Sequence, residues 1–278
     1  MSDAIQELRD VRGPSALGGG WRRSADLLYL IAVTEFKRSY LGTALGYLWS
    51  LGRPLLLFAV LLTVFTQAFD LGDRVVSYPM LLLFNIVLFG FFQEATTQAV
   101  GSIVSQEAVV RKTQFPRLVI PLAVVLTSLF NLAVNLVVVL AFILVAGIEP
   151  VWTWLLFPLV LAWLVVLTTA VATILAALFP RFRDTGIIWG VAVTALFYAT
   201  PVLYPLEFVS GTLQDLLALS PLTPIFELAR KWVIDPDAPV LAAGGGFALL
   251  VPVGVLAALC ALAVWIFRRE APRIAEEL

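Results

Sequence analysis

Glu94 is the one carboxylate that lies well inside a long apolar block of this 278-residue sequence, directly after Phe91, Phe92 and Gln93. An ionisable side chain in such a block is costly to bury and commonly marks a substrate or ion pathway. Glu94 is therefore a candidate pathway residue. A hydrogen-bonded structural role near a helix end is the alternative, and the sequence leaves both interpretations open.

A second set of polar side chains recurs every four residues at Thr127, Asn131 and Asn135, with Ser128 beside them. On an α-helix this spacing places the three residues on one face. Hydrogen bonding to neighbouring helices is the simpler interpretation of such a stripe in an apolar segment. Lining of a polar conduit is the alternative.

Aromatic residues gather in block 185–204, which contains Trp189, Phe197, Tyr198 and Tyr204. Tyrosine and tryptophan commonly form belts where a helix leaves the membrane. Aromatic faces also suit stacking on sugar rings, because the ring C–H groups are apolar while the hydroxyls stay solvated. The sequence leaves both interpretations of these aromatic residues open.

Several kinds of chemistry lack the residues they need. The sequence has no histidine, and its single cysteine, Cys260, lies in an apolar block, so we expect no metal site. Residues 244–246 are three glycines, but apolar residues follow them and the lysine of a phosphate-binding loop is missing. We therefore expect no catalytic residue and no cofactor in this chain. The spans also lack the charged residues of a proton- or sodium-coupled carrier, so another subunit must supply any transport energy.

Composition predicts an all-α polytopic membrane protein. The sequence is 61% hydrophobic and only 13% charged, with a mean hydropathy of +0.98, whereas a soluble domain carries roughly a quarter charged residues. Crossing a bilayer takes about 20 apolar residues. Six blocks are long enough: 45–69, 78–100, 118–146, 152–179, 185–204 and 246–267.

The distribution of positive charge orients these six spans. With the N-terminus in the cytoplasm, 15 of the 18 Lys and Arg residues fall on the inner side, and only Arg74, Arg230 and Lys231 fall outside. Cytoplasmic loops carry such an excess of Lys and Arg. We therefore predict a multi-pass protein of the bacterial cytoplasmic (inner) membrane, with both termini in the cytoplasm.

Four regions are predicted along the chain. Residues 1–20 are a flexible cytoplasmic tail, 45–270 form the transmembrane domain, and 271–278 are a second cytoplasmic tail. Residues 21–44 mix apolar and charged side chains and are predicted to form an amphipathic helix in the membrane interface. A frayed cytoplasmic extension is the alternative for this stretch. Its interface residues are Glu35, Lys37, Arg38 and Tyr40.

The segment between the fifth and sixth spans, 206–245, is divided by prolines and is still rich in leucine. Irregular backbone at membrane depth must be buried in protein or face a water-filled cavity. We therefore predict short re-entrant helices in this segment.

Several short stretches together resemble a known family. They are SIVSQEAVVRKTQFPRLVIP at 102–121, EFKRSY at 35–40, LGYLW at 45–49, RP at 53–54, RFRD at 181–184, LYPL at 203–206 and SPLTP at 220–224. Their order and spacing resemble the membrane subunit of type-2 ATP-binding-cassette exporters. The branch that is most similar exports lipid-linked polysaccharides such as O-antigen, teichoic acid and galactan. The resemblance covers roughly residues 22–270.

This resemblance implies partners and roles. Two copies of the chain would form a homodimer with two separate nucleotide-binding ATPase subunits, which would hold ATP and Mg. Segment 21–44 would contact the ATPase and the lipids of the inner leaflet, and the re-entrant helices would gate the exit. The aromatic residues of the fifth span would contribute to the conduit, whose predicted residues are Phe197, Tyr198, Tyr204 and Glu94. The cytoplasmic coupling element would comprise Glu107, Arg111, Lys112, Phe115, Pro116 and Arg117. The alternative for these residues is positive charge that merely sets topology.

The predicted function is the permease half of an exporter that moves a polyprenyl-pyrophosphate-linked polysaccharide from the cytoplasmic to the outer leaflet. Arg38 and Arg53 are candidates to attract the pyrophosphate, since arginine pairs bidentately with phosphate oxygens. A type-2 exporter of a small amphiphile or drug is the alternative. A membrane-embedded lipid-sugar glycosyltransferase would need acidic residues clustered beside a basic phosphate site, which this sequence does not show. No nucleic-acid partner is expected.

Overall fold

The computed structural model describes residues 21–41, 46–106, 117–240 and 249–270. Every regular element in these ranges is a helix, which confirms the all-α prediction. Five of the six predicted coupling residues, Glu107 to Pro116, lie outside the described residues.

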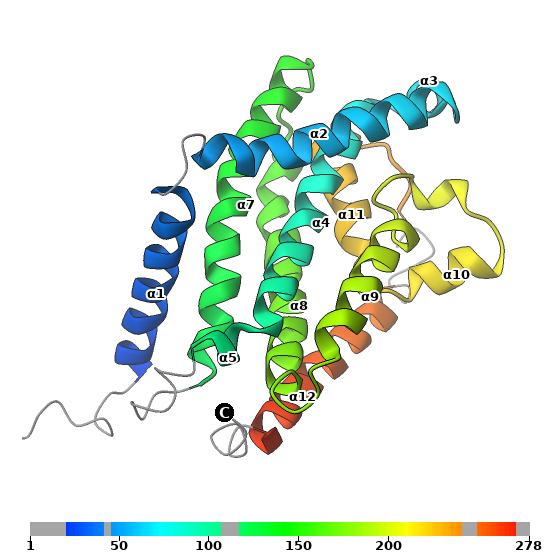
Figure 1. The fold of residues 1–278 in the computed structure, drawn as a ribbon. Helices are drawn as coiled ribbons and strands as arrows, with labels where there is room; N and C mark the ends of the chain where they lie inside the picture. The colour runs from blue at the N-terminus through cyan, green and yellow to red at the C-terminus, as the bar shows by residue number, and fades with distance from the viewer. Residues whose placement is uncertain (1–20, 42–45, 107–116, 241–248, 271–278) are drawn as a thin grey trace, which may run out of the picture.

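Four of the helices in the described ranges are long and apolar enough to cross a membrane. They are α4 (Tyr78–Val100), α7 (Val119–Val145), α8 (Phe157–Leu178), which the 3-10 helix η1 (Trp152–Leu156) extends, and α12 (Leu250–Glu270). They stand side by side in a bundle (Figure 1). The chain is therefore a multi-pass membrane protein, and these helices correspond to four of the predicted spans.

Two further helices, whose apolar stretches Leu51–Gln67 and Thr185–Ala199 are shorter, take the places of the first and fifth predicted spans. In the view of Figure 1, α2 (Gly46–Gln67) lies across the upper part of the bundle, and α9 (Thr185–Ala199) stands beside α4. The 15 residues of α9 measure about 22 Å, which is less than the hydrocarbon core of about 30 Å. The count of six spans therefore stays a prediction.

The fifth predicted span, 185–204, was wrong at its end, because α9 stops at Ala199. Pro201 follows, and a proline disfavours the helical conformation of the residue before it. Thr200 accordingly has φ −84° and ψ 157°, an extended conformation. The chain then turns along α4, where the Tyr78 hydroxyl donates a hydrogen bond of 2.8 Å to the Leu203 carbonyl.

The core of the bundle is α4, whose most apolar stretch is 72% buried, against 11% for α12. Its side chains Phe84, Phe89 and Phe92 are almost fully enclosed. The ring of Phe89 contacts Phe197 of α9 at 5.2 Å between centroids and lies 6.4 Å from Phe226. A helix that is apolar on every side belongs in the interior of a bundle.

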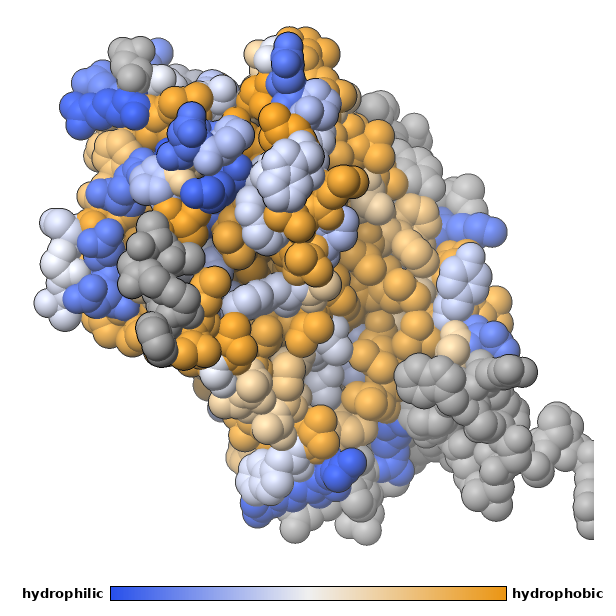
Figure 2. All heavy atoms as spheres, turned by 180° about the vertical axis from the view of Figure 1, so that it is seen from behind, coloured by the Kyte–Doolittle hydropathy of each residue, from blue (hydrophilic) through white to orange (hydrophobic). Residues whose placement is uncertain are grey.

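The outer surface of the bundle is apolar, as a lipid-facing surface must be. On α12 the exposed side chains include Val253, Leu262, Val264 and Trp265. Figure 2 shows hydrophobic residues over most of the middle of one face, with hydrophilic residues gathered towards its margins.

Residues 21–41 form a single helix, α1 (Trp21–Leu41), as expected, and it packs beside α7 (Figure 1). The Phe36 and Phe130 rings meet edge to face at 5.6 Å. The Thr127 hydroxyl donates a hydrogen bond of 3.3 Å to the Ala32 carbonyl. In this arrangement α1 runs along a span instead of across it, so its placement in the membrane interface stays a prediction.

Segment 206–240 folds into short helices, and we call it the outer segment because the charge pattern predicts it on that side. They are η2 (Leu206–Phe208), α10 (Thr212–Ala218), α11 (Thr223–Ala229) and the π-helix η3 (Arg230–Ile234). Side chains near the start of the fourth predicted span bind backbone carbonyls of this segment: Trp154 to Val233 at 3.1 Å, Thr153 to Trp232 at 2.7 Å and Trp163 to Pro221 at 3.1 Å. The short helices are as expected, while their re-entrant placement stays a prediction.

Single cysteines test the six-span topology. In a Cys260→Ser background with an N-terminal epitope tag, we expect a membrane-impermeant maleimide to label Arg74→Cys and Asp237→Cys on intact spheroplasts. We expect Asp184→Cys and the tag to become accessible only after permeabilisation, because the charge pattern predicts both in the cytoplasm. The native side chains at positions 74, 184 and 237 are exposed, so a cysteine at each can react. If the tag and position 74 are accessible from the same side of the membrane, α2 does not cross the membrane. If positions 184 and 237 share a side, α9 does not cross.

Candidate functional site

Glu94 lies where α2, α4 and α7 approach one another. Its Oε1 accepts hydrogen bonds from the Asn131 amide at 2.6 Å and from the Gln98 amide at 3.3 Å. Arg53 of α2 is close enough to attract the carboxylate electrostatically. Glu94 is thus hydrogen-bonded between α4 and α7, while the Arg53 side chain is exposed on α2.

The polar stripe of α7 binds its neighbours on two sides. Thr127 donates to the Ala32 carbonyl of α1, and Asn131 donates to Glu94 of α4. Asn135 donates back to the Asn131 carbonyl at 2.8 Å. Two of these three bonds join α7 to another helix, which supports hydrogen bonding between helices as the role of the stripe.

The predicted conduit aromatics occupy different environments. Phe197 is 7% exposed and packs into the aromatic core, whereas Tyr198 is 59% exposed. The Tyr204 hydroxyl donates weakly to the Tyr198 and Ala199 carbonyls, at 3.2 and 3.3 Å. Of these three aromatic residues, only Tyr198 has its ring exposed on the surface of the bundle. The conduit role of Phe197, Tyr198, Tyr204 and Glu94 stays a prediction.

The basic residues of the predicted interface and coupling elements are accessible where they are described. Arg38 pairs with Glu35 at 3.9 Å on the exposed side of α1, and Lys37 is also exposed. Arg117 precedes α7 and is partly buried. The Tyr40 side chain lies outside the described part of the structure.

A buried carboxylate at the end of α12 joins two arginines. Glu270 Oε2 lies 3.6 Å from Arg181 and Oε1 lies 3.8 Å from Arg269. The loop between α8 and α9 is thereby tied to α12. Sequence reasoning counted both arginines as topology-setting charges, and Arg181 also as part of the RFRD stretch, but it did not foresee their shared partner, which is 89 positions from Arg181 in the chain.

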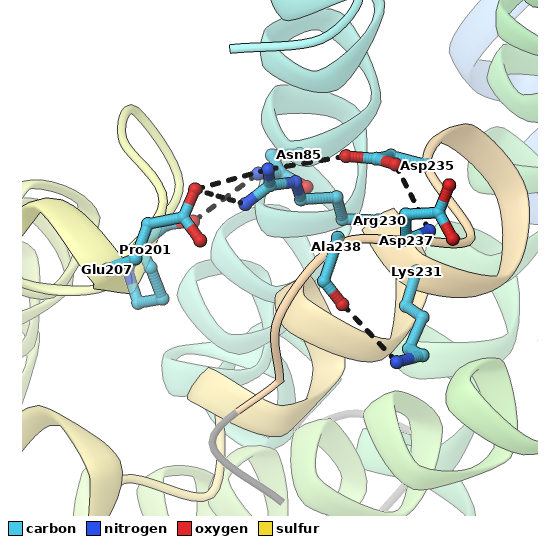
Figure 3. Close-up of polar contacts among 8 residues, drawn as sticks. All are labelled: Asn85, Pro201, Glu207, Arg230, Lys231, Asp235, Asp237 and Ala238. Atoms are coloured by element: carbon cyan, nitrogen blue, oxygen red, sulfur yellow. Dashed lines mark hydrogen bonds and ion pairs between the residues drawn. The ribbon is translucent and has the colours of Figure 1, made fainter. Parts of the chain in front are cut away.

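A third polar cluster, in the outer segment, was also missed. Arg230 is 8% exposed and donates from Nη1 and Nη2 to Glu207 Oε1, at 3.2 and 3.3 Å, while Nη2 lies 3.5 Å from Asp235 Oδ2 (Figure 3). Beside it the Asn85 amide donates to the Pro201 and Val202 carbonyls, at 3.3 and 3.2 Å. The cluster joins η2 and η3 of the outer segment, next to α4. Its signal in the sequence was the pair Arg230 and Lys231, followed by Asp235 after three apolar residues.

Neither polar site resembles a metal centre. The described residues contain no group of three or more Cys, Asp or Glu side chains placed to hold a metal ion. What the geometry offers is a bundle of apolar helices with one carboxylate at membrane depth and a charged cluster on the outer side.

Comparison with known proteins decides the family. Residues 26–233 match the family described as ABC-2 type transporter. The chain belongs to this family. One relative is the O-antigen export system permease protein RfbA of Myxococcus xanthus, 30% identical over 88% of this chain and 93% of the relative. An O-antigen export system permease protein RfbA of Klebsiella pneumoniae is 27% identical over 71% and 76%. The polysialic acid transport protein KpsM of Escherichia coli is 23% identical over 68% and 74%.

Replacing Asn131 tests the polar site of this ABC-2 transporter chain. We expect Asn131→Leu to lower the free energy of unfolding in detergent micelles by about 0.6–1.7 kcal/mol, the range for hydrogen bonds between membrane helices. The matched control is Val137→Leu, on the same helix at a position that is 69% exposed, where we expect no change. Equal stability of Asn131→Leu and the wild type would show that the 2.6 Å bond contributes nothing.

Proposed function

We propose that this chain is the permease half of an ATP-driven exporter that carries a lipid-linked polysaccharide from the cytoplasmic to the outer leaflet. The observation that carries this proposal is the match to an O-antigen export permease over 88% of this chain and 93% of that relative. A match of this extent aligns nearly the whole bundle, including the inner loops and the outer segment. A small amphiphile is the less favoured cargo, because the relatives named above export O-antigen or transport polysialic acid.

The energy source in this proposal is a separate ATPase subunit, present in two copies. The sequence lacks a phosphate-binding loop of its own. Segment 107–117 is the proposed docking element, with Arg117 at its described end. The ion pairs that join Arg181 to Glu270 and Glu270 to Arg269 support transmission of movement at this end of the bundle. They would carry a displacement of the loop between α8 and α9 into α12.

A second copy of the chain would complete the pathway. The outward side of α9 exposes Ile187, Ile188, Val191 and Tyr198. Residues 187, 191 and 198 follow helical spacing, so they line one face. We propose that this face meets the partner protomer, where Tyr198 would offer a ring to passing sugars.

Copurification tests the exporter assignment. With a C-terminal tag and mild detergents, we expect mass spectrometry of native-host membranes to find a nucleotide-hydrolysing subunit in about equal amount to this chain. A polyprenyl-linked glycan in the preparation would support the cargo. The control is an unrelated tagged polytopic protein from the same membranes. If no ATPase accompanies the chain in any of several detergents, the exporter proposal fails.

Arg53 tests the proposed contact with the pyrophosphate. Because charge-assisted bonds between arginine and phosphate are among the stronger hydrogen bonds, we expect Arg53→Ala to raise the glycolipid concentration for half-maximal ATPase stimulation about tenfold. We expect the control Arg74→Ala, at another exposed arginine, to leave that concentration unchanged, which separates loss of the phosphate contact from a general loss of positive charge. Unchanged stimulation and export in Arg53→Ala would remove Arg53 from the site.

A further inference from the structure

The last three turns of α12 carry a stripe of exposed side chains that changes from apolar to basic. Ala258, Leu262, Trp265 and Arg269 are all exposed and follow one another at intervals of four, three and four residues. This is the spacing of one helix face. Phe267, on the opposite face, packs inside the bundle. The stripe therefore points away from the bundle, where lipid covers a membrane-spanning helix.

The basic end of this stripe is joined by the loop between α8 and α9, which lies beside the end of α12 (Figure 1). Arg181 of the loop and Arg269 of α12 approach the same carboxylate, that of Glu270, at 3.6 and 3.8 Å. The Glu270 side chain is only 10% exposed, whereas those of Arg181 and Arg269 are 43% and 56% exposed. The carboxylate thus lies beneath the two guanidinium groups, and both keep surface for a further partner.

The charge at this end of the bundle is positive. Arg183 and Arg268 are also exposed, and neither pairs with a carboxylate within the described part of the chain. In the described residues of the loop and the last turn of α12, these two arginines and the pair on Glu270 stand against two carboxylates, Asp184 and Glu270, which leaves a net charge of +2. Basic clusters at the membrane surface attract anionic lipids.

Exposed aromatic rings lie directly beside these arginines. The Arg269 guanidinium carbon is 5.2 Å from the centre of the Trp265 ring, and that of Arg181 is 5.2 Å from the centre of the Phe182 ring. Tryptophan is enriched at the level of the lipid headgroups. Positive charge and apolar surface therefore adjoin, as an amphiphilic anion requires. A soluble anion would use the arginines alone, and a cytoplasmic subunit would not reach the apolar part of the stripe on α12.

We propose that this end of α12 binds an anionic phospholipid, whose phosphate lies at Arg181, Arg268 and Arg269 and whose acyl chain follows Trp265 and Leu262. Arginine suits the phosphate because its planar group of N–H donors matches the phosphate oxygens. None of these residues is assigned to the cargo, so the lipid site does not depend on the exporter proposal. A bound phosphate joins the loop between α8 and α9 to α12, in addition to the ion pairs of Glu270.

Native mass spectrometry of the full chain in detergent micelles tests the lipid site by titration with phosphatidylglycerol and phosphatidylcholine of the same acyl chains. We expect the wild type to bind phosphatidylglycerol at least about fivefold more tightly, since each basic residue near the surface contributes about that factor. The double variant Arg268→Gln, Arg269→Gln leaves Glu270 paired with Arg181. We expect it to bind phosphatidylglycerol about twentyfold more weakly and phosphatidylcholine unchanged. The matched control is Arg74→Gln, an exposed arginine away from this end of the bundle, which we expect to leave both affinities unchanged.

Four results would overturn the proposal. Equal affinity of the wild type for the two lipids would contradict the charge argument, and unchanged phosphatidylglycerol binding in the double variant would place the lipid elsewhere. Displacement of phosphatidylglycerol by an equal concentration of glycerol phosphate would make this a site for soluble anions. Loss of the preference when a copurifying ATPase is bound would assign the surface to that subunit. Should the double variant misfold, Arg268→Gln alone removes no ion pair of the described residues, and we expect it to weaken phosphatidylglycerol binding about fivefold.

Discussion

The burial of α4 is the constraint on which the rest of the bundle depends. Its apolar side chains point in all directions, so α7, α8, α9 and α2 must each cover part of it. Phe89 shows the result, since its ring meets a ring from α9 and another from α11. In lipid there is little hydrophobic force between helices, and close packing with hydrogen bonds takes its place. The aromatic contacts around α4 are the packing part of that balance.

Hydrogen bonds between α4 and its neighbours are the second contribution to the stability of the bundle, and they lie at three levels along α4. Tyr78 and Asn85 hold the chain that follows α9, Glu94 holds α7, and the Thr96 hydroxyl accepts a bond of 3.1 Å from Trp189 of α9. Each joins α4 to a segment that is distant in the sequence. The central helix therefore fixes both the lateral position and the vertical register of its neighbours.

The sequence was most informative where structure is set locally. The bounds 78–100 agree with α4, because a long apolar run flanked by polar turns determines a helix without help from its neighbours. The end of α9 was misplaced because hydropathy continues through Tyr204, whereas Pro201 ends the helix. A hydropathy pattern shows which residues are apolar. It does not show that a proline within an apolar run ends the helix.

The polar sites were predictable only in part. Glu94 and Asn131 were each noticed, yet their contact joins residues 37 positions apart and depends on how α4 and α7 pack. Arg230 was counted as an outer charge, and nothing in the sequence placed it beside Glu207 or against Asn85. The direction in which an arginine points is decided by the whole fold, so composition and spacing identify the residue type but not its partners.

The attachment of the outer segment has a consequence for how such proteins diversify. Trp154, Trp163 and Thr153 bind its main-chain carbonyls, and so do Tyr78 and Asn85 on the preceding chain. A carbonyl is present whatever the side chain of its residue. Mutations can therefore alter the side chains of this segment while the hydrogen bonds from the bundle to its carbonyls stay intact. The side chains of this segment that make no such contact are free to change, whereas the bundle residues that bind its carbonyls are not.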